Sequence, residues 1–343
     1  MWQARRFSAE NRKKMDKHAL SGHVSMLGAN VMWGLMSPLA KMLFVGGALT
    51  PLVLTDLRIF GAMVLFWLVS FFQKPEHVPH KDMLRLLGAS LLAIVFNQGA
   101  FIFGVGLTSP ASASVITTSM PLWAMVLAAV FLREPVTGRK VLGIAAGAGG
   151  ALLLIMGSGG GNVAQGAAGS HPVLGDLLVL LAQLSYASYI VLFKDFVGRY
   201  SLVTIMKWMF TYAFIFTLPF SYRGLLAAGW GQLSAPDVAR IAFIVVGATF
   251  GSYLLTVVGQ KTLRPTVAGM YNYVQPVVAT VVAVCLSLDT FNVVKALAVC
   301  LIFAGVWLVT ASRSRQEMEA HRARQAGAAS ADAGAGPTDA GRP

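Results

Sequence analysis

The chain has 343 residues, of which 56% are hydrophobic and only 12% are charged, and its mean hydropathy is +0.67. This composition excludes an ordinary soluble domain and points to a protein of the lipid bilayer. The net charge of +13 is also typical of nucleic-acid-binding proteins, but the basic residues gather beside apolar segments, so we expect no nucleic-acid partner.

Ten apolar segments are long enough to cross the hydrocarbon core, which takes about 20 helical residues. In chain order they cover residues 24–44, 52–72, 84–105, 111–131, 139–157, 173–193, 203–222, 238–258, 266–287 and 293–311. Their continuous composition favours helices over the alternating strands of a β-barrel. The expected fold is therefore an all-α membrane protein with ten transmembrane helices.

The basic residues predict the orientation of these spans. With ten crossings both termini lie on one side, and most of the 27 basic residues then fall at the termini or in even-numbered loops. Only Arg223, Arg240 and Lys295 fall in odd-numbered loops. Because basic loops stay inside, we expect both termini in the cytoplasm.

The second half of the chain repeats the first. At an offset of 155, residues 110–153 match 265–308 without gaps, pairing Pro121 with Pro276 and Gly150 with Gly305. A shorter match at an offset of 153 joins the first span to the sixth. Since each half holds five spans, an odd number, we expect two inverted five-helix repeats.

The expected organisation follows from these boundaries. It comprises a basic N-terminal segment (1–22), a first repeat (23–157), a Gly-rich outer linker (158–172), a second repeat (173–311) and a disordered tail (312–343).

Four motifs carry a family resemblance: "ANVMWG" in the first span, "PLVLTDLR" entering the second, "TTSMPLWAMVLAAVFLREPVTGRKVLG" across the fourth and fifth, and "GDLLVLLAQLSYA" opening the second half. In their order and spacing the chain resembles the drug/metabolite transporter superfamily, in its ten-span EamA-type branch. The resemblance covers residues 24–311. It implies a bacterial inner-membrane permease, expected to export small metabolites such as amino acids by alternating access.

The resemblance also implies functional positions. The family's tryptophan of the first span falls on Trp33, its arginine of the second span on Arg58, and the acid of its four-to-five loop on Glu134. The second half departs from this pattern, with Tyr186 in place of the tryptophan and Asp289 in place of the glutamate.

Three charged residues lie inside the first two spans: Lys41, Asp56 and Arg58. Charges in a membrane are costly, so they usually pair or face a wet cavity. Asp56 and Arg58 lie about 200° apart around a helix and cannot share one face. One interpretation is an ion pair of Asp56 with Lys41 or Arg58 that leaves a cation for a substrate carboxylate. The other is a purely structural pair with a snorkelling Lys41.

Further polar residues follow helical spacing within the spans, where they either line a solvated cavity or join helices. As substrate-binding candidates we take, besides the charged three, Asn30, Trp33, Ser37, Asn97, Gln98, Thr117, Gln183, Tyr186, Tyr253 and Asn272. Amides, hydroxyls and aromatic rings suit a small zwitterionic or aromatic solute.

Two prolines are expected in mid-span, where each removes a backbone hydrogen bond and bends its helix. Pro121 and Pro276 are candidate gating bends, with a simple packing kink as the alternative. Gly143 and Gly147 allow a close helix approach, within the chain or in a homodimer, although a monomer is sufficient. Cys285 and Cys300 are expected to be buried and free of disulfides.

The sequence contains no motif for catalysis, and we expect no cofactor, no resident metal and no enzyme activity. "EHVPH" at 76–80 is the one metal-like cluster, in a short loop. Two alternatives to a simple permease remain: a proton-coupled antiporter that uses Asp56, and a membrane-embedded enzyme acting on lipid-linked substrates.

Overall fold

The computed structural model describes residues 2–131, 138–158, 171–193, 196, 199–262, 271–289 and 292–310. The described residues are helical between turns and include no strand. The first-half helices are α1 (Trp2–Val45), α2 (Pro51–Ser70), α3 (His80–Ser90), η1 (Leu91–Phe96), α4 (Asn97–Leu107), α5 (Pro110–Thr117), α6 (Met120–Phe131) and α7 (Gly138–Ser158). The second-half helices are α8 (Pro172–Leu192), α10 (Leu202–Ala227), η2 (Trp230–Gln232), α11 (Ala235–Ala242), η3 (Phe243–Gly251), α12 (Ser252–Thr262), η4 (Tyr271–Tyr273), α14 (Val274–Cys285) and α15 (Val293–Thr310).

When interrupted helices are joined, these elements form ten helical segments among the described residues. Six of them are long and apolar enough to cross a membrane, and three shorter apolar stretches lie in α7, α14 and α15. The first expected span, 24–44, forms the C-terminal half of α1. The prediction of an all-α, ten-helix membrane protein is therefore confirmed.

Several helices begin where the sequence supplies a cap. Thr50, Ser109, Ser201 and Ser234 occupy N-cap positions, and each side chain accepts a hydrogen bond from a backbone N–H of the first turn. The turn between α1 and α2 depends on Gly47, whose φ of +67° suits a residue without Cβ. These local signals fix where α2, α5, α10 and α11 enter the bundle.

Four segments are interrupted near their middle. The third and eighth contain π-helical turns, η1 and η3, and the fourth breaks at residues 118–119 between α5 and α6. The ninth begins its described part with the short 3₁₀ helix η4, followed directly by α14. π-Helical turns and broken helices release backbone groups and often lie at functional sites.

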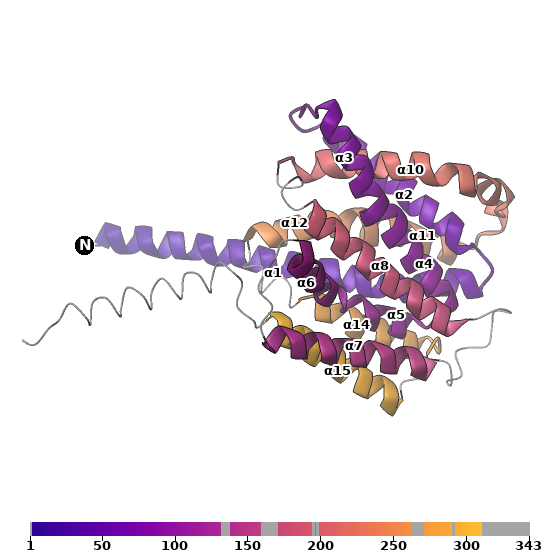
Figure 1. The fold of residues 1–343 in the computed structure, drawn as a ribbon. Coiled ribbons are helices and arrows are strands. Elements are labelled where there is room, and N and C mark those ends of the chain that lie inside the picture. The colour runs from indigo at the N-terminus through magenta and orange to yellow at the C-terminus, as the bar shows by residue number, and fades with distance from the viewer. Residues whose placement is uncertain are drawn as a thin grey trace, which may run out of the picture.

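Helices from the two halves pack against one another throughout the bundle (Figure 1). α2 runs antiparallel to α10, because Phe60 meets Phe214 with ring centroids 5.1 Å apart and Trp67 meets Trp208 at 5.3 Å. α1 packs against α12, and α4 packs against α8. Every described helix that crosses the bundle therefore has neighbours from the other half.

α7 and α15 pack closely against each other. A Cβ on Gly305 would lie 2.6 Å from the carbonyl oxygen of Gly143 and 2.6 Å from the backbone nitrogen of Gly147. A Cβ on Gly150 would lie 2.9 Å from the carbonyl oxygen of Ala298. The small residues of α7 thus serve a contact within the chain, as one of the two interpretations of Gly143 and Gly147 expected.

Much of the outer surface is apolar. Phe72 is 90% exposed and Leu226 80%, although both are large hydrophobic residues. Cys285 and Cys300 also lie exposed, so the expectation that they pack inside the protein is wrong. In a soluble protein this surface would aggregate, whereas here it faces the position of lipid tails.

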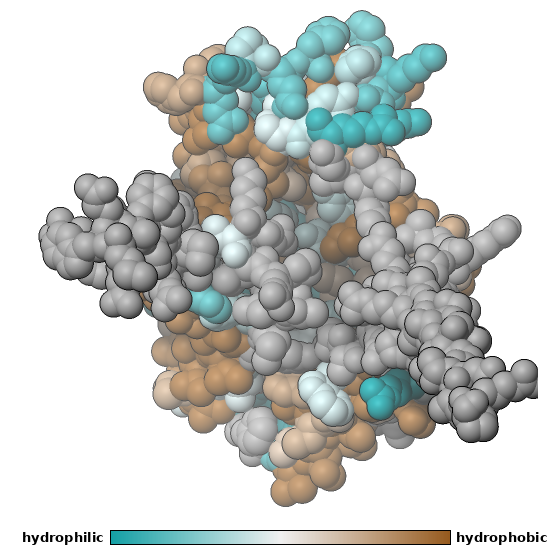
Figure 2. All heavy atoms as spheres, turned by 90° about the vertical axis from the view of Figure 1, so that its left-hand side faces the viewer, coloured by the Kyte–Doolittle hydropathy of each residue, from teal (hydrophilic) through white to brown (hydrophobic). Residues whose placement is uncertain are grey.

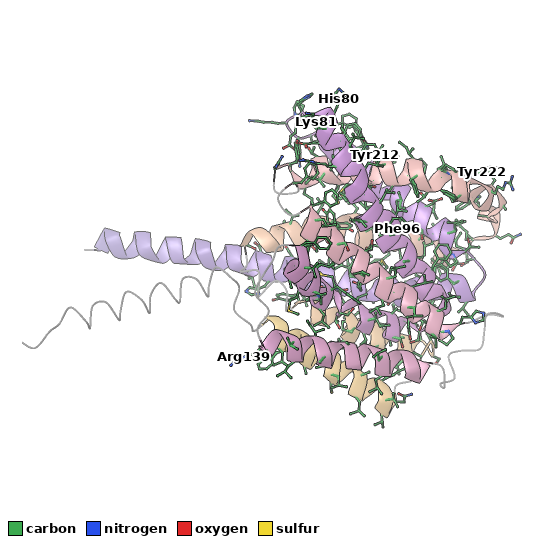
Figure 3. The ribbon with its side chains drawn as sticks, in the orientation of Figure 1. His80, Lys81, Phe96, Arg139, Tyr212 and Tyr222 are labelled. Atoms are coloured by element: carbon green, nitrogen blue, oxygen red, sulfur yellow. The ribbon has the colours of Figure 1, made fainter. Side chains whose placement is uncertain are left out.

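Polar residues gather at one edge of the end from which α1 projects (Figure 2). Figure 2 looks onto the end from which α1 projects in Figure 1, and polar residues gather at its upper edge. Lys81 and Arg85 of α3, and Lys74 shortly before this helix, are exposed basic residues. In Figure 3, Lys81 and Arg139 lie toward the same end, while Tyr222 lies at the opposite one.

Candidate functional site

Arg58 stands at the centre of a polar cluster inside the bundle. Its side chain is only 3% exposed, and its Nε donates a hydrogen bond to Thr249 Oγ1 at 3.0 Å. Its Nη1 is buried and makes no hydrogen bond with any described residue. The guanidinium therefore has an unused N–H donor that can bind a ligand.

The π-helical turn η3 prepares the partner of Arg58. Thr249 donates its own hydroxyl to the carbonyl oxygen of Ile244, five residues earlier, at 2.8 Å, as the wider helix allows. Its oxygen is thereby free to accept from the arginine. Thr249 is not among the predicted site residues, since nothing in the pattern of residues predicts a π turn.

Gln98 and Tyr253 bring the third and eighth segments together beside this arginine. Gln98 Nε2 donates to the Tyr253 hydroxyl at 3.4 Å, while Gln98 Oε1 is buried and makes no hydrogen bond with the described residues. Tyr253 also meets Trp33 edge-on, with ring centroids 6.2 Å apart. The cluster of Trp33, Arg58, Gln98, Thr249 and Tyr253, hereafter the central cluster, thus joins four segments of the chain.

Two predicted amides, Asn30 of α1 and Asn97 of α4, make contacts outside the central cluster. Asn30 is fully buried, donates to the carbonyl oxygen of Met26 at 2.8 Å and accepts from Gln275 at 2.7 Å. Asn97 donates to the carbonyl oxygen of Ala182 at 2.9 Å. Asn30 and Asn97 therefore join helices in this structure.

The remaining uncharged candidates form no hydrogen bond with the central cluster in the part of the chain that the structure describes. Thr117 donates to the carbonyl oxygen of Ser114 in its own helix at 2.6 Å. Gln183 is buried, Tyr186 contacts the ring of Tyr189, and Asn272 lies half-buried in η4. These contacts are compatible with helix packing.

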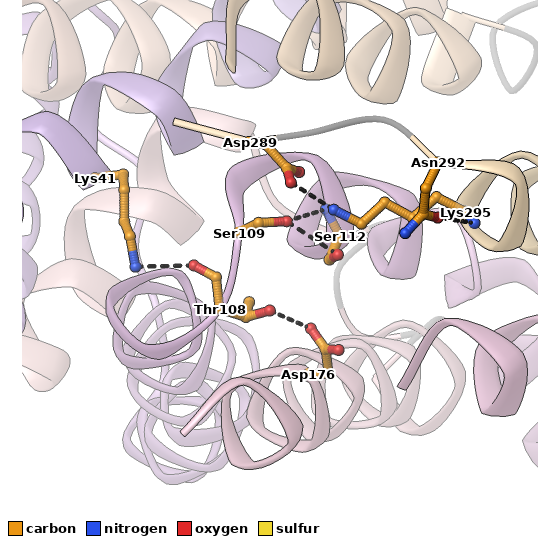
Figure 4. A network of polar contacts seen from close by, with 8 residues as sticks. All are labelled: Lys41, Thr108, Ser109, Ser112, Asp176, Asp289, Asn292 and Lys295. Carbon is orange, nitrogen blue, oxygen red and sulfur yellow. Dashed lines mark hydrogen bonds and ion pairs between the residues drawn. The ribbon is translucent and has the colours of Figure 1, made fainter. Parts of the chain in front are cut away.

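Lys41 takes part in a second group of polar contacts, apart from the central cluster (Figure 4). Its Nζ donates to the carbonyl oxygens of Gly106 and Thr108 at 2.8 Å and 2.9 Å. Thr108 in turn donates its hydroxyl to Asp176 of α8 at 2.6 Å. This chain of contacts, hereafter the end network, connects α1 to the second half.

Other polar contacts flank the end network. Asp289 and Lys295 form an ion pair beside Ser109 and Ser112, whose hydroxyls lie 3.0 Å apart (Figure 4). Ser37, a predicted site residue, lies 2.9 Å from Ser114 through its hydroxyl. Lys41 and Ser37 are thus both engaged with the start of α5 and the turn before it.

The prediction that Asp56 forms an ion pair with Lys41 or Arg58 is wrong. Asp56 is 1% exposed, and neither carboxylate oxygen makes a hydrogen bond or ion pair with the described residues. Lys41 is engaged by backbone carbonyls and Arg58 by Thr249. The sequence could not predict these partners, because it does not show which residue of a neighbouring helix each side chain faces.

The two prolines lie differently from the mid-span kinks that we expected. Pro121 is the second residue of α6, and Pro276 is the third residue of α14. Each belongs to a first turn, where a missing N–H costs little. The interruption precedes each proline, and a gating role for Pro121 and Pro276 stays a prediction.

Some predictions fall outside the described residues. Glu134, most of the linker at 158–172 and the tail at 312–343 belong to this group. Within the described part of the chain, no group of three or more His, Cys, Asp or Glu residues could hold a metal ion.

Comparison with known proteins gives the family of this helical bundle. The model of the EamA-like transporter family matches residues 20–156 and again residues 173–311. The chain belongs to the EamA-like transporter family. It is a multi-pass membrane transporter of the drug/metabolite transporter superfamily and not an enzyme.

Relatives of this EamA-like transporter carry matching descriptions. The uncharacterized transporter YetK of Bacillus subtilis (strain 168) is 22% identical over 302 residues, which cover 87% of each chain. An uncharacterized transporter of Archaeoglobus fulgidus is 25% identical over 209 residues, covering 60% of this chain and 69% of the relative. A solved structure, described as a crystal structure of a protein, matches the fold with a TM-score of 0.57 at 18% identity, covering 86% of this chain and 98% of its own.

Proposed function

We propose that this EamA-like transporter is a permease for small zwitterionic solutes such as amino acids. The observation that carries the proposal is the pair of unsatisfied groups in the central cluster. Arg58 Nη1 is a buried donor and Gln98 Oε1 a buried acceptor, and neither has a partner among the described residues. A zwitterion supplies the complement of both, because its carboxylate accepts from a guanidinium and its ammonium donates to an amide oxygen.

The surrounding rings suit the body of such a solute. Trp33 and Tyr253 present aromatic faces and edges beside the polar pair, and Phe210 meets Tyr253 with ring centroids 6.1 Å apart. Apolar walls with a few polar groups are the usual composition of a small-molecule site. An amino acid with an apolar or aromatic side chain fits this arrangement best.

The mechanism that we propose is alternating access between two inverted five-helix repeats. Under the 155-residue offset, α7 corresponds to α15, and their close contact is reciprocal. Gly150 meets Ile302, the counterpart of Gly147, and Gly305, the counterpart of Gly150, meets Gly147. Reciprocal contacts are expected about a twofold axis.

The direction of the paired helices favours inversion. α2 and α10, the second segments of the two halves, run antiparallel, as the rings of Phe60 with Phe214 and Trp67 with Trp208 indicate. The interruptions also correspond, because η1 (Leu91–Phe96) falls on residues 246–251 of η3 at the same offset. The family model that matches each half separately supports the same duplication.

We further propose that the end network closes the outer end of the path in this conformation. The basic residues Lys81 and Arg139 lie toward the other end (Figure 3), which by the positive-inside rule is the cytoplasmic one. Both termini would then be cytoplasmic, in a bacterial inner membrane. Export is the direction expected from the family resemblance, and one chain holds the whole central cluster, so a monomer suffices.

Reconstitution tests this proposal. Purified protein in liposomes should move labelled amino acids without added nucleotide, and Arg58→Ala should reduce that flux at least tenfold, while Arg58→Lys retains part of it. Arg223→Ala is a matched control, because Arg223 bonds only to the neighbouring Tyr222 on an exposed surface. A panel of amino acids that shows no flux above empty liposomes would refute the function, and unaltered kinetics in Arg58→Ala would remove Arg58 from the site.

A further inference from the structure

Asp56 is a buried carboxyl in the first turns of α2 that the proposed solute site does not use. It is 1% exposed, and both of its oxygens lack a hydrogen bond or ion pair with the described residues. The sequence left open whether such a residue takes part in proton coupling.

The basic residues near Asp56 are engaged elsewhere. Arg58, two residues later, points to Thr249 of η3 on another face of α2, and Lys41 donates to carbonyl oxygens of the end network. A carboxylate at this position would therefore be a bare negative charge inside the membrane, which is strongly unfavourable.

The helices packed against α2 offer no charge to neutralise Asp56. These are α10, η3 and α4, of which η3 and α4 contain no titratable residue. On α10, Lys207 lies over the ring of Trp67 and Arg223 bonds to Tyr222. Tyr212, the remaining titratable group of α10, contacts the ring of Trp208.

Thr217 of α10 is the polar group that faces Asp56. Its hydroxyl lies close enough to interact with the Asp56 carboxyl, and it has no other polar partner among the described residues. Two unsatisfied polar groups thus face each other between α2 and α10, which are paired from one half to the other. Addition of a proton to the carboxyl removes the charge and lets the carboxyl itself donate to the threonine hydroxyl.

We propose that Asp56 and Thr217 form a proton-binding site within the membrane. The bound state is the neutral carboxyl beside the threonine hydroxyl, and release gives a carboxylate and a proton that passes to water. Coupling to solute movement rests on the proposed alternating access, because release requires a conformation in which water reaches α2 and α10. Proton binding itself does not depend on any solute.

Infrared spectroscopy of the full chain in liposomes tests the site without a substrate. The carbonyl stretch of a protonated carboxyl is separate from that of a carboxylate. The difference spectrum between wild type and Asp56→Asn isolates the signal of Asp56 from those of Asp176 and Asp289. We expect a protonated-carboxyl band whose midpoint lies above that of an exposed aspartate. Above that midpoint, the protonated fraction should fall about tenfold per pH unit. The band should be missing in Asp56→Asn.

Thr217→Val provides a second variant that keeps the acid. Loss of the hydroxyl should shift the band frequency, and it should move the midpoint to higher pH, because the hydroxyl can no longer donate to the carboxylate. Replacing choline chloride by sodium chloride at constant pH should leave the band unchanged. A band suppressed by sodium would show a sodium site instead, and identical carboxyl spectra in wild type and Asp56→Asn would overturn the proposal. Amino-acid flux is measured separately, so failure of either proposal is recognised without the other.

Discussion

Gln98 donates a hydrogen bond to Tyr253 at 3.4 Å, and the two residues are separated by 155 positions, which is the offset of the sequence repeat. Residues at equivalent positions of two halves meet only close to the axis that relates those halves. Under the proposed twofold arrangement, the central cluster therefore lies on this axis. A solute bound there would contact both halves at once, as alternating access requires.

The hydroxyl of Tyr253 can be tested separately from its ring. Tyr253→Phe removes the hydrogen bond with Gln98 and keeps the edge contact with Trp33, so we expect a loss of about 1 kcal/mol in solute binding. This corresponds to a rise of about fivefold in KM for amino-acid flux into liposomes. Tyr212→Phe is the control, since Tyr212 contacts the ring of Trp208 and not the central cluster. Equal KM values in both variants would contradict a role for the hydroxyl.

The sequence predicted the helices well because hydrophobic length is a strong signal in a membrane protein. It could not predict the π turns of η1 and η3, since their residues are ordinary helix formers such as Leu91 and Val246. The sequence predicted the interruption at Pro121, whereas the helix breaks at residues 118–119. A proline fits the first turn of a new helix as well as a kink inside a continuous one, so its position alone does not locate the break.

The candidate site was predicted in part. Trp33, Arg58, Gln98 and Tyr253 do come together, since helical spacing selects polar residues that face the interior. The partner of Arg58 was missed, because Thr249 is an unremarkable hydroxyl in an apolar segment. The pairing of Asp56 was wrong, because helical spacing gives the face of a residue but not which residue of another helix opposes it.

The α7–α15 contact predicts a sharp sensitivity at Gly305. Gly305→Ala places a methyl group against the backbone of Gly143 and Gly147, which cannot move aside as a side chain could. We expect a destabilisation of about 2 kcal/mol, read as a lower Tm in detergent. Gly149→Ala is the matched control, because nothing lies within 4 Å of its added Cβ. If both variants melt alike, the close packing is not the cause.

The end network predicts that Thr108 holds one end of the bundle closed. Thr108→Val removes the hydrogen bond to Asp176, a bond to an acidic group worth about 1.5 kcal/mol. The closed state should lose that advantage, so Ser112→Cys in a background without Cys285 and Cys300 should react about tenfold faster with an impermeant maleimide. Thr262→Val is the control, since the Thr262 hydroxyl bonds only to carbonyls of its own helix. Unchanged reactivity would show that the network does not hold the closed state.

Outside the membrane-spanning segments, Glu76 forms hydrogen bonds whose contribution to stability depends on pH. Partial desolvation raises its pKa, but hydrogen bonds from Thr204 and from the backbone and hydroxyl of Ser201 outweigh it, so its pKa lies below the ordinary value of 4.5. The Ser201 hydroxyl lies 2.9 Å from the carboxylate, at the N-cap of α10. Because folding favours the ionised form, the contribution of Glu76 to folding stability is complete above pH 4.5 and is lost as pH falls through the folded pKa.

Glu76→Gln should therefore lower Tm at neutral pH, and the difference in Tm between this variant and wild type should shrink in acid. A difference that stays constant with pH would mean that the charge of Glu76 contributes nothing, and that only its shape holds the start of α10.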